Sequence, residues 1–328
     1  MKRIIFAAAL LAVTFGTMGN ALADKKMKGN VRIDGSSTVY PISEAVAEEF
    51  NAQYPRVRVT IGVSGTGGGF KKFTVGETDI NNASRPIKGK EITKAGEEGV
   101  GFIELPVAFD GLSVVVNPQN DWVDHFTTEE LQRIWQPESD VTYWSDVRPE
   151  WPNEKIKLYG PGTDSGTFDY FTEAINGKSQ LCRADFTASE DDNVLVQGIA
   201  GDKYALGFFG YAYYIENTDK LRIAPIDGGN GPQIPTAETI NTGAYSPLSR
   251  PLFVYVSDTA AAREDIQIFV NYYLDNAGEL AGEVGYVALP EKAYELAKQR
   301  FEKKITGSVF ADKESTVGLK LEDLLAIQ

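Results

Sequence analysis

The stretch Ser64-Gly65-Thr66-Gly67-Gly68-Gly69-Phe70-Lys71-Lys72 decides how this chain folds, and two shorter segments repeat its chemistry: Gly35-Ser36-Ser37-Thr38 and Asp164-Ser165-Gly166-Thr167. An extended or turn-prone run precedes each segment and an apolar periodic run follows it, which is typical of a loop that opens into a helix. Unpaired backbone N–H groups and partial positive charge at a helix start can hold a tetrahedral oxyanion. Any one segment alone is more simply an ordinary helix cap, but three together indicate an anion site.

The chain around these segments predicts strands that alternate with helices. Short strands are expected at residues 31–33 and 57–61, each followed by one of the segments and then by a helix. This order favours a parallel or mixed sheet, in which ligands lie at the carboxyl ends of the strands.

The rest of the sequence predicts a second group of alternating strands and helices, and hence two α/β lobes. Apolar runs at 102–109 and 112–116 are separated by Asp110-Gly111, where the aspartate is either a turn residue or a ligand. Residues 122–151 are interpreted as a loop-rich surface. Further strands are expected at 156–159, 205–215 and 252–256, and further helices at 90–99, 127–135, 168–175, 193–199, 259–276, 290–303 and 319–326.

The first 23 residues have the pattern of a signal peptide. Lys2 and Arg3 precede an apolar run at 4–15, and Ala21-Leu22-Ala23 fits a cleavage site, so cleavage is expected after Ala23. The only cysteine is Cys182, which excludes an internal disulfide and a lipid anchor on a new terminal cysteine. A soluble periplasmic protein is therefore predicted.

The chain is acidic, with a net charge of −14, and removing the two basic residues of the signal peptide gives −14 − 2 = −16. Such a charge argues against nucleic acid and anionic lipid as partners. It also repels an anionic ligand at long range, so affinity for an anion must come from short-range donors inside a site.

The sequence lacks two common enzyme motifs. Gly62 to Gly67 is followed by Gly68 where a Walker phosphate loop needs lysine, and Gly62-Val63-Ser64-Gly65-Thr66 lacks the last glycine of a nucleophile elbow. His125 is the single histidine, in what is interpreted as a surface turn. No catalytic residue, metal or cofactor is therefore expected, and a secreted serine hydrolase or phosphatase is kept only as an alternative.

The motifs, taken in order, resemble the periplasmic phosphate-binding proteins of Pst-type ABC transporters. They are Asp-Gly-Ser-Ser-Thr at 34–38, Ser-Gly-Thr-Gly-Gly-Gly at 64–69, Ala-Ser-Arg-Pro at 83–86 and Asp-Ser-Gly-Thr at 164–167. The resemblance covers essentially the whole mature chain.

This resemblance implies an α/β clamshell of the type II periplasmic-binding fold, with mixed sheets flanked by helices and two crossings between the lobes. Lobe one would comprise residues 24–108 and 252–328, and lobe two residues 109–251. It also implies that the chain binds inorganic phosphate in the cleft and delivers it, as a monomer, to an inner-membrane ABC permease. Sulfate, molybdate or a phosphonate remain alternative ligands.

Site residues carried over from the resemblance come from both lobes. Arg85 occupies the position of an aspartate in the best-known branch, and the arginine that this branch has before Ser-Gly-Thr is replaced by Pro161 or Gly162. Arg85 is expected either to hold the anion with its planar fork or to pair with a nearby acid. Asp110, or less favourably Asp164, would accept the proton of the phosphate. The full set is Ser37, Thr38, Ser64, Thr66, Gly67, Ser84, Arg85, Asp110, Asp164, Ser165, Gly166 and Thr167, with Ser64 the weaker serine.

Overall fold

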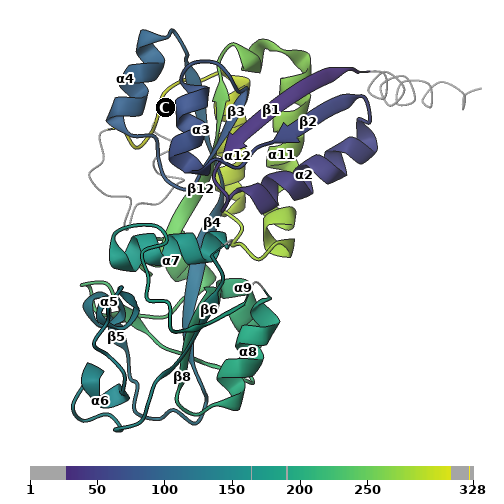
Figure 1. Cartoon of the computed structure of the whole chain (residues 1–328). Helices are drawn as coiled ribbons and strands as arrows, with labels where there is room; N and C mark the ends of the chain where they lie inside the picture. Colours follow the sequence, from purple (N-terminus) through teal and green to yellow (C-terminus); the bar gives the residue numbers. More distant parts are fainter. Residues whose placement is uncertain (1–26, 164, 190, 312–324, 326–328) are drawn as a thin grey trace, which may run out of the picture.

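Two α/β lobes, joined by long extended strands, make up this computed structural model (Figure 1). It describes residues 27–163, 165–189, 191–311 and 325. The expected signal peptide with its cleavage after Ala23, the acid Asp164, and all but one residue of the helix expected at 319–326 lie outside the described residues.

The first lobe is built on parallel strands that alternate with helices, as the sequence pattern predicts. Strands β1 (Gly29–Gly35), β2 (Val57–Ile61) and β3 (Ile80–Ala83) lie in the order β2-β1-β3, and β12 (Ser249–Ser257) and β4 (Phe102–Val116) continue the sheet in antiparallel pairing. The helices of this lobe are α2 (Tyr40–Gln53), α3 (Gly65–Phe73), α4 (Gly89–Glu97), α11 (Glu264–Glu283) and α12 (Glu291–Glu302), with a 3₁₀ turn η1 (Ala260–Ala262).

Strand β4 passes without a break from one lobe to the other. Its 15 residues are all buried, and they pair with β12 up to Gly111 and with β8 from Leu112 onward. The turn reading of Asp110 is therefore wrong: the ladder with two partner strands outweighs the local turn preference of Asp-Gly. Figure 1 shows β4 and β12 running between the lobes near the expected crossings. The predicted lobe boundaries themselves remain a prediction.

The second lobe continues the same sheet and adds a small one. Strand β4 pairs with β8 (Ala205–Gly210), followed by β6 (Lys157–Pro161) and β7 (Thr187–Ser189), and β9 (Arg222–Ile223) also pairs with β4. The small sheet contains β5 (Phe126–Thr127), β10 (Ile226–Asp227) and β11 (Pro232–Gln233). The helices are α5 (Thr128–Trp135), α6 (Trp144–Val147), α7 (Gly166–Asn176), α8 (Asp192–Gly201), α9 (Tyr211–Ile215) and α10 (Ala237–Asn241).

Three expectations about elements need correction. The strand expected at 205–215 ends at Gly210, and the rest is the helix α9. The helix expected at 259–276 begins as η1 and continues in α11 to Glu283. Residues 122–151 are not merely a surface, because Trp135 and Trp144 are fully buried. These indole rings pack against other aromatic rings. Trp135 meets Phe208 edge to face with the ring centroids 5.0 Å apart, and such contacts explain why a loop-rich region packs as core.

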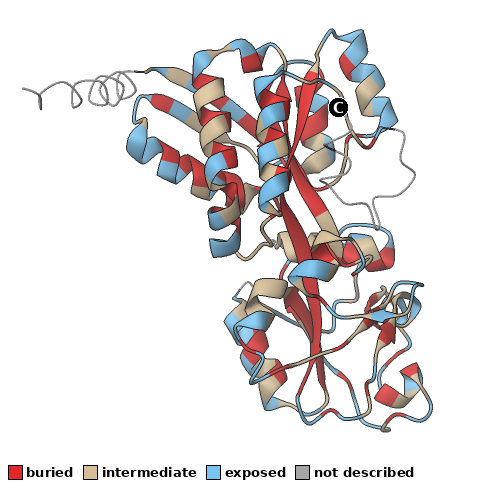
Figure 2. Cartoon of the chain, turned by 180° about the vertical axis from the view of Figure 1, so that it is seen from behind, coloured by how far each residue is buried: buried red, intermediate tan, exposed pale blue. Residues whose placement is uncertain are grey.

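The apolar residues lie where the sheet meets the helices. Figure 2 shows the strands of both lobes mostly buried and the outward sides of the helices exposed. The long helix α11 packs against α2 through Phe269, whose ring meets that of Phe50 edge to face at 5.1 Å. Within the described part of the chain, no helix has the length and apolar character needed to span a bilayer.

Candidate functional site

Helix starts from both lobes face one another. Helices α2 and α3 follow β1 and β2 of the first lobe, and α7 follows β6 of the second. A Cβ placed on Gly166, the first residue of α7, would lie 3.0 Å from Cα and 3.2 Å from N of Thr38. Residues 128 positions apart in sequence thus touch across the two lobes, and the predicted segments at 35–38 and 164–167 meet.

A polar pocket of about 320 Å³ lies beside this contact. Six of the predicted site residues line it, namely Ser37, Thr38, Thr66, Gly67, Ser84 and Arg85. The others that line it were not predicted: Ser36, Gly65, Lys88, Asp169, Glu173, Ser179 and Arg250.

The donors on the first lobe are held in place by bonds between β3 and α3. Oγ1 of Thr66 accepts a hydrogen bond from the backbone N–H of Ser84 at 3.1 Å and lies 3.0 Å from Oγ of Ser84. The end of a strand and the start of a helix are therefore fixed together at the edge of the pocket.

Close backbone approach beneath the pocket requires glycine. A Cβ on Gly69 would lie 2.5 Å from Cα of Gly35, and Gly35 itself has φ of +134°. Both positions exclude larger residues. The glycine-rich stretch thus lets α3 lie directly against the loop that carries Ser37 and Thr38.

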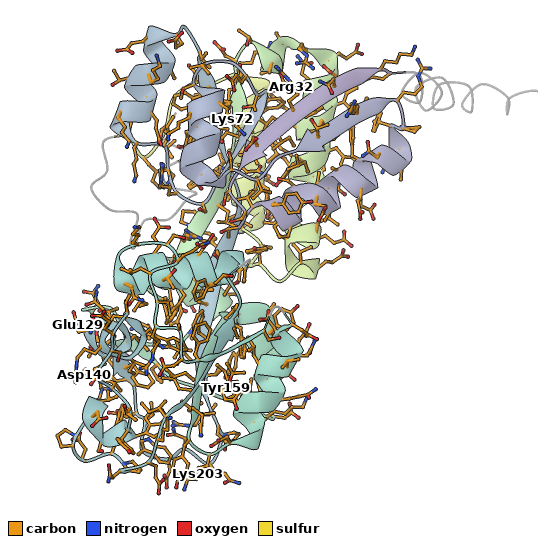
Figure 3. The ribbon with its side chains drawn as sticks, in the orientation of Figure 1. Arg32, Lys72, Glu129, Asp140, Tyr159 and Lys203 are labelled. Carbon is orange, nitrogen blue, oxygen red and sulfur yellow. The ribbon has the colours of Figure 1, made fainter. Side chains whose placement is uncertain are left out.

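Ser64 points away from the pocket, since its hydroxyl donates to Asp34. Asp34 also pairs with Lys72 of α3, whose Nζ is 2.6 Å from Oδ2 of the acid. Figure 3 labels Lys72 in the upper lobe, the first lobe of the text. Ser64 does not line the pocket, and its hydroxyl is used to hold α3 to the end of β1.

In the third predicted segment, the start of α7 is capped by its own serine. Oγ of Ser165 accepts from the backbone N–H of Thr167 at 3.2 Å. Gly166 lies at the contact with Thr38, but neither it nor Ser165 nor Thr167 is among the residues that line the pocket. Their role toward a ligand stays a prediction.

Arg85 has its planar fork occupied within its own lobe. Its Nη1 and Nη2 donate to the two carboxylate oxygens of Glu91 at 2.9 and 2.8 Å, and Nη1 also donates to the carbonyl of Pro86. Burial would raise the pKa of Glu91, but the bonds from Arg85 and from the Lys88 backbone hold it below its usual value. In this structure, Arg85 makes the ion pair that the sequence left open as the alternative to anion binding.

Arg250 was missed by the sequence reasoning and lies between the lobes. Its Nη2 donates to Oγ1 of Thr38 at 3.1 Å on one side, while on the other its guanidinium carbon lies 3.6 Å from the ring centroid of Tyr170. Its Nη1 is 3.8 Å from Oε2 of Glu173, too far for a direct hydrogen bond. One arginine therefore contacts a helix start of the first lobe and helix α7 of the second.

Asp110 lies behind Arg250 rather than in the pocket. The two residues are direct partners in the β4–β12 ladder, and Nε of Arg250 lies 3.5 Å from Oδ2 of Asp110. Neither atom has a closer partner among the described residues. Burial raises the pKa of Asp110 to about 6, against the lowering effect of Arg250. The sequence led us to expect Asp110 to face the cleft. In the structure Asp110 lies beneath Arg250, and Arg250 is the residue that faces the cleft.

The positions of Arg250, Asp169 and Glu173 in the sequence could have indicated that they line the pocket. Arg250 stands in Pro247-Leu248-Ser249-Arg250-Pro251, at the second expected crossing between the lobes. Asp169 and Glu173 follow Gly166 at spacings of three and seven, which places them on the same face of α7 as the residue that touches Thr38. No group of His, Cys, Asp and Glu in the described part of the chain could hold a metal ion.

Both the sequence and the fold of this chain are similar to those of known proteins. The chain matches the profile of the PBP superfamily domain over residues 20–277. It is 53% identical over 298 residues to Protein SphX of Synechococcus elongatus, covering 90% of this chain and 88% of that protein. It is 41% identical over 289 residues to the phosphate-binding protein PstS of Staphylococcus saprophyticus, covering 88% of each. The crystal structure of a possible phosphate binding protein from Planctomyces limnophilus superposes with a TM-score of 0.83 at 46% identity, covering 85% of this chain and 100% of that one.

Proposed function

This chain belongs to the PBP superfamily, in the branch that contains SphX and the phosphate-binding protein PstS, and we propose that it binds inorganic phosphate for an ABC-type membrane permease. The observation that carries the proposal is the polar pocket, which both lobes line and which Arg250 enters from the strands that join them. A ligand held by both lobes favours the closed arrangement, since only that arrangement supplies all of its contacts.

The pocket offers the donors that a tetrahedral oxyanion needs. The hydroxyls of Ser37, Thr38 and Thr66 line it, and so does the backbone at the start of α3, where N–H groups have no partner within the helix. The guanidinium of Arg250 supplies a full positive charge. In an acidic chain these short-range contacts hold the anion once it has entered.

We propose binding without chemical conversion. The single histidine, His125, does not line the pocket, and its Nδ1 is 3.0 Å from Oδ2 of Asp124. The same region includes Arg148, whose guanidinium pairs with both Asp124 and Glu130. These contacts account for His125 as part of a polar network around Arg148.

We also propose the compartment in which the protein acts and its oligomeric state. The signal-like residues 1–23, with cleavage after Ala23, would direct the chain to the periplasm, where it would act as a monomer that presents bound phosphate to an inner-membrane permease. The relative named PstS, a phosphate-binding protein, supports the ligand part of this proposal.

Titration calorimetry tests the proposal. Protein freed of bound ligand is titrated with inorganic phosphate, and then with sulfate, molybdate and a phosphonate, each alone and as a competitor. We expect saturable one-to-one binding of phosphate, and much weaker binding of the others. Absence of any heat with phosphate, together with saturable binding of another oxyanion, would assign the pocket to that anion instead.

A further inference from the structure

Tyr255 of β12 is fully buried, does not line the pocket, and contacts a segment that does. Its hydroxyl oxygen accepts a hydrogen bond from the backbone N–H of Ile87 at 2.9 Å. Ile87 ends the segment 84–87, whose first two residues, Ser84 and Arg85, line the pocket. Tyr255 therefore holds a pocket-lining segment from a position that the ligand does not reach.

The ring of Tyr255 contacts a second pocket-lining element, the helix α3. It meets the ring of Phe70 edge to face, with the centroids 5.0 Å apart. Thr66, one turn before Phe70 in α3, lines the pocket, and its Oγ1 accepts a hydrogen bond from the backbone N–H of Ser84. The hydroxyl and the ring of Tyr255 thus support the two sides of one junction, between the segment 84–87 and the start of α3.

A buried carboxylate orients the hydroxyl of Tyr255. Glu104 is the direct partner of Tyr255 in the β4–β12 ladder, and its Oε2 accepts a hydrogen bond from the Tyr255 hydroxyl at 2.7 Å. A tyrosine hydroxyl has a single proton, so once that proton is given to Glu104 the oxygen is left as an acceptor. The bond to Glu104 therefore prepares the oxygen to receive the N–H of Ile87.

Glu104 is fixed in turn by the residues that follow α12. The hydroxyl of Ser308 donates to its Oε2 at 2.6 Å, and the backbone N–H of Val309 donates to its Oε1 at 2.9 Å. With Tyr255, these donors satisfy a carboxylate that is only 1% exposed, which a buried acid requires. Glu104 thus has a defined place from which it directs the Tyr255 hydroxyl.

We propose that Tyr255, oriented by Glu104, is a positioning residue for anion binding, which holds Ser84 and Thr66 in place before the ligand arrives. A hydrogen bond weakens steeply when its donor is displaced or turned, so the wall of the pocket has to be rigid if closure of the lobes is to complete the site. This inference rests on the proposed phosphate function. It concerns the rigidity of the first lobe and gives Tyr255 no part in choosing among anions.

The test is Tyr255→Phe in the full-length mature protein, with Tyr294→Phe as the matched control. Tyr294 makes the same two kinds of bond elsewhere, since its hydroxyl accepts from the N–H of Leu289 and donates to the carbonyl of Val107, and none of these residues lines the pocket. We expect both variants to lose similar stability in urea denaturation. Only Tyr255→Phe should lose phosphate affinity in calorimetry, by roughly tenfold, the effect of about one hydrogen bond.

Amide hydrogen exchange tests the inference without any variant. In the unmodified protein, the N–H of Ile87 should be protected from exchange before phosphate is added. Protection that appears only with phosphate would mean that the ligand, and not Tyr255, orders the segment 84–87. In Tyr255→Phe, exchange at this amide should be faster than in Tyr294→Phe.

A conservative variant, Glu104→Gln, separates the hydrogen bond from the charge. Glutamine keeps an oxygen that accepts from Tyr255, so phosphate affinity should stay within about threefold of the unmodified protein. A tenfold loss there would assign the effect to the charge of Glu104 and overturn the inference.

Two further results would overturn the positioning role while leaving phosphate binding intact. One is an equal loss of affinity in Tyr255→Phe and Tyr294→Phe, which would make the effect a general loosening of the first lobe. The other is unchanged affinity in Tyr255→Phe. If the unmodified protein binds no phosphate at all, the proposed function itself fails, and calorimetry shows this before any variant is measured.

Discussion

The two arginines of the cleft, Arg85 and Arg250, have the same side chain and opposite surroundings. Arg85 donates both arms of its fork to Glu91 in its own lobe. Arg250 has one hydrogen bond to Thr38, loose approaches to Asp110 and Glu173, and an Nε without a partner among the described residues. Spare donor capacity, rather than residue type, therefore marks the cation available to a ligand.

The largest effect is expected for Arg250→Ala. The variant should lose phosphate affinity by about 100-fold or more, because charge-assisted hydrogen bonds contribute about 1.5–3 kcal/mol each. It should also lose about 3–5 kcal/mol of unfolding free energy, because Asp110 is left as a buried charge without a partner.

The double variant Arg250→Ala with Asp110→Asn separates the two effects. It should recover much of the stability in urea denaturation while still failing to bind phosphate in calorimetry. Recovery of near-normal affinity in the double variant would show that Arg250 serves only to neutralise Asp110.

The next effect concerns pH and Asp110. Burial raises its pKa to about 6 from an ordinary value near 3.8, so the folded state binds the proton more tightly than the unfolded state. Stability from this group is therefore present at low pH and is lost as pH rises from about 4 to 6, by at most about 3 kcal/mol.

Urea denaturation of the protein and of Asp110→Asn at a series of pH values measures this effect. The unfolding free energy of the unmodified protein, relative to the variant, should fall between pH 4 and 6. A difference that rises over the same range would mean that Arg250 lowers the pKa of Asp110 more than burial raises it.

Local sequence patterns identified some of the residues that line the pocket and missed others. Ser37, Thr38, Thr66 and Gly67 were found because local signals, a strand followed by a hydroxyl-rich helix start, determine where they lie. Arg250 and Glu173 were missed because they reach the pocket only through the crossing of β12 and the docking of α7, which no local pattern records.

Asp110 shows the opposite failure. The dipeptide Asp110-Gly111 has the composition of a turn, but pairing with β12 on one side of the crossing and with β8 on the other keeps it extended. The aromatic run at 205–215 likewise has the composition of one strand throughout. In the structure the strand β8 ends at Gly210, and the remaining residues form the helix α9.

A smaller effect is expected at the contact between the lobes. Gly166→Ala places a methyl group about 3 Å from the Thr38 backbone, so it should oppose closure and lower phosphate affinity by about tenfold. Gly282→Ala is the matched control, since it lies in α11 with no atom within 4 Å of the new Cβ. Equal affinities for both variants would mean that the contact between Gly166 and Thr38 is absent from the bound state.

The smallest effect is expected for Arg85→Lys. Because its fork already serves Glu91, the variant should lose phosphate affinity only a few-fold and stability by less than about 1 kcal/mol. Arg250→Lys, measured beside it, should lose clearly more affinity because lysine lacks the planar fork. A larger loss for Arg85→Lys would reverse the comparison and make Arg85 the principal cation of the site.

The most direct test of the shared phosphate site is a crystal structure with arsenate, a tetrahedral analogue of phosphate whose anomalous scattering marks its position. The predicted result is one peak in the pocket, within hydrogen-bond distance of the Arg250 guanidinium and of the Thr38 hydroxyl, with α7 of the second lobe beside it. A peak elsewhere, such as the groove between α3 and α4 lined by Lys71, Lys90 and Lys94, would contradict it.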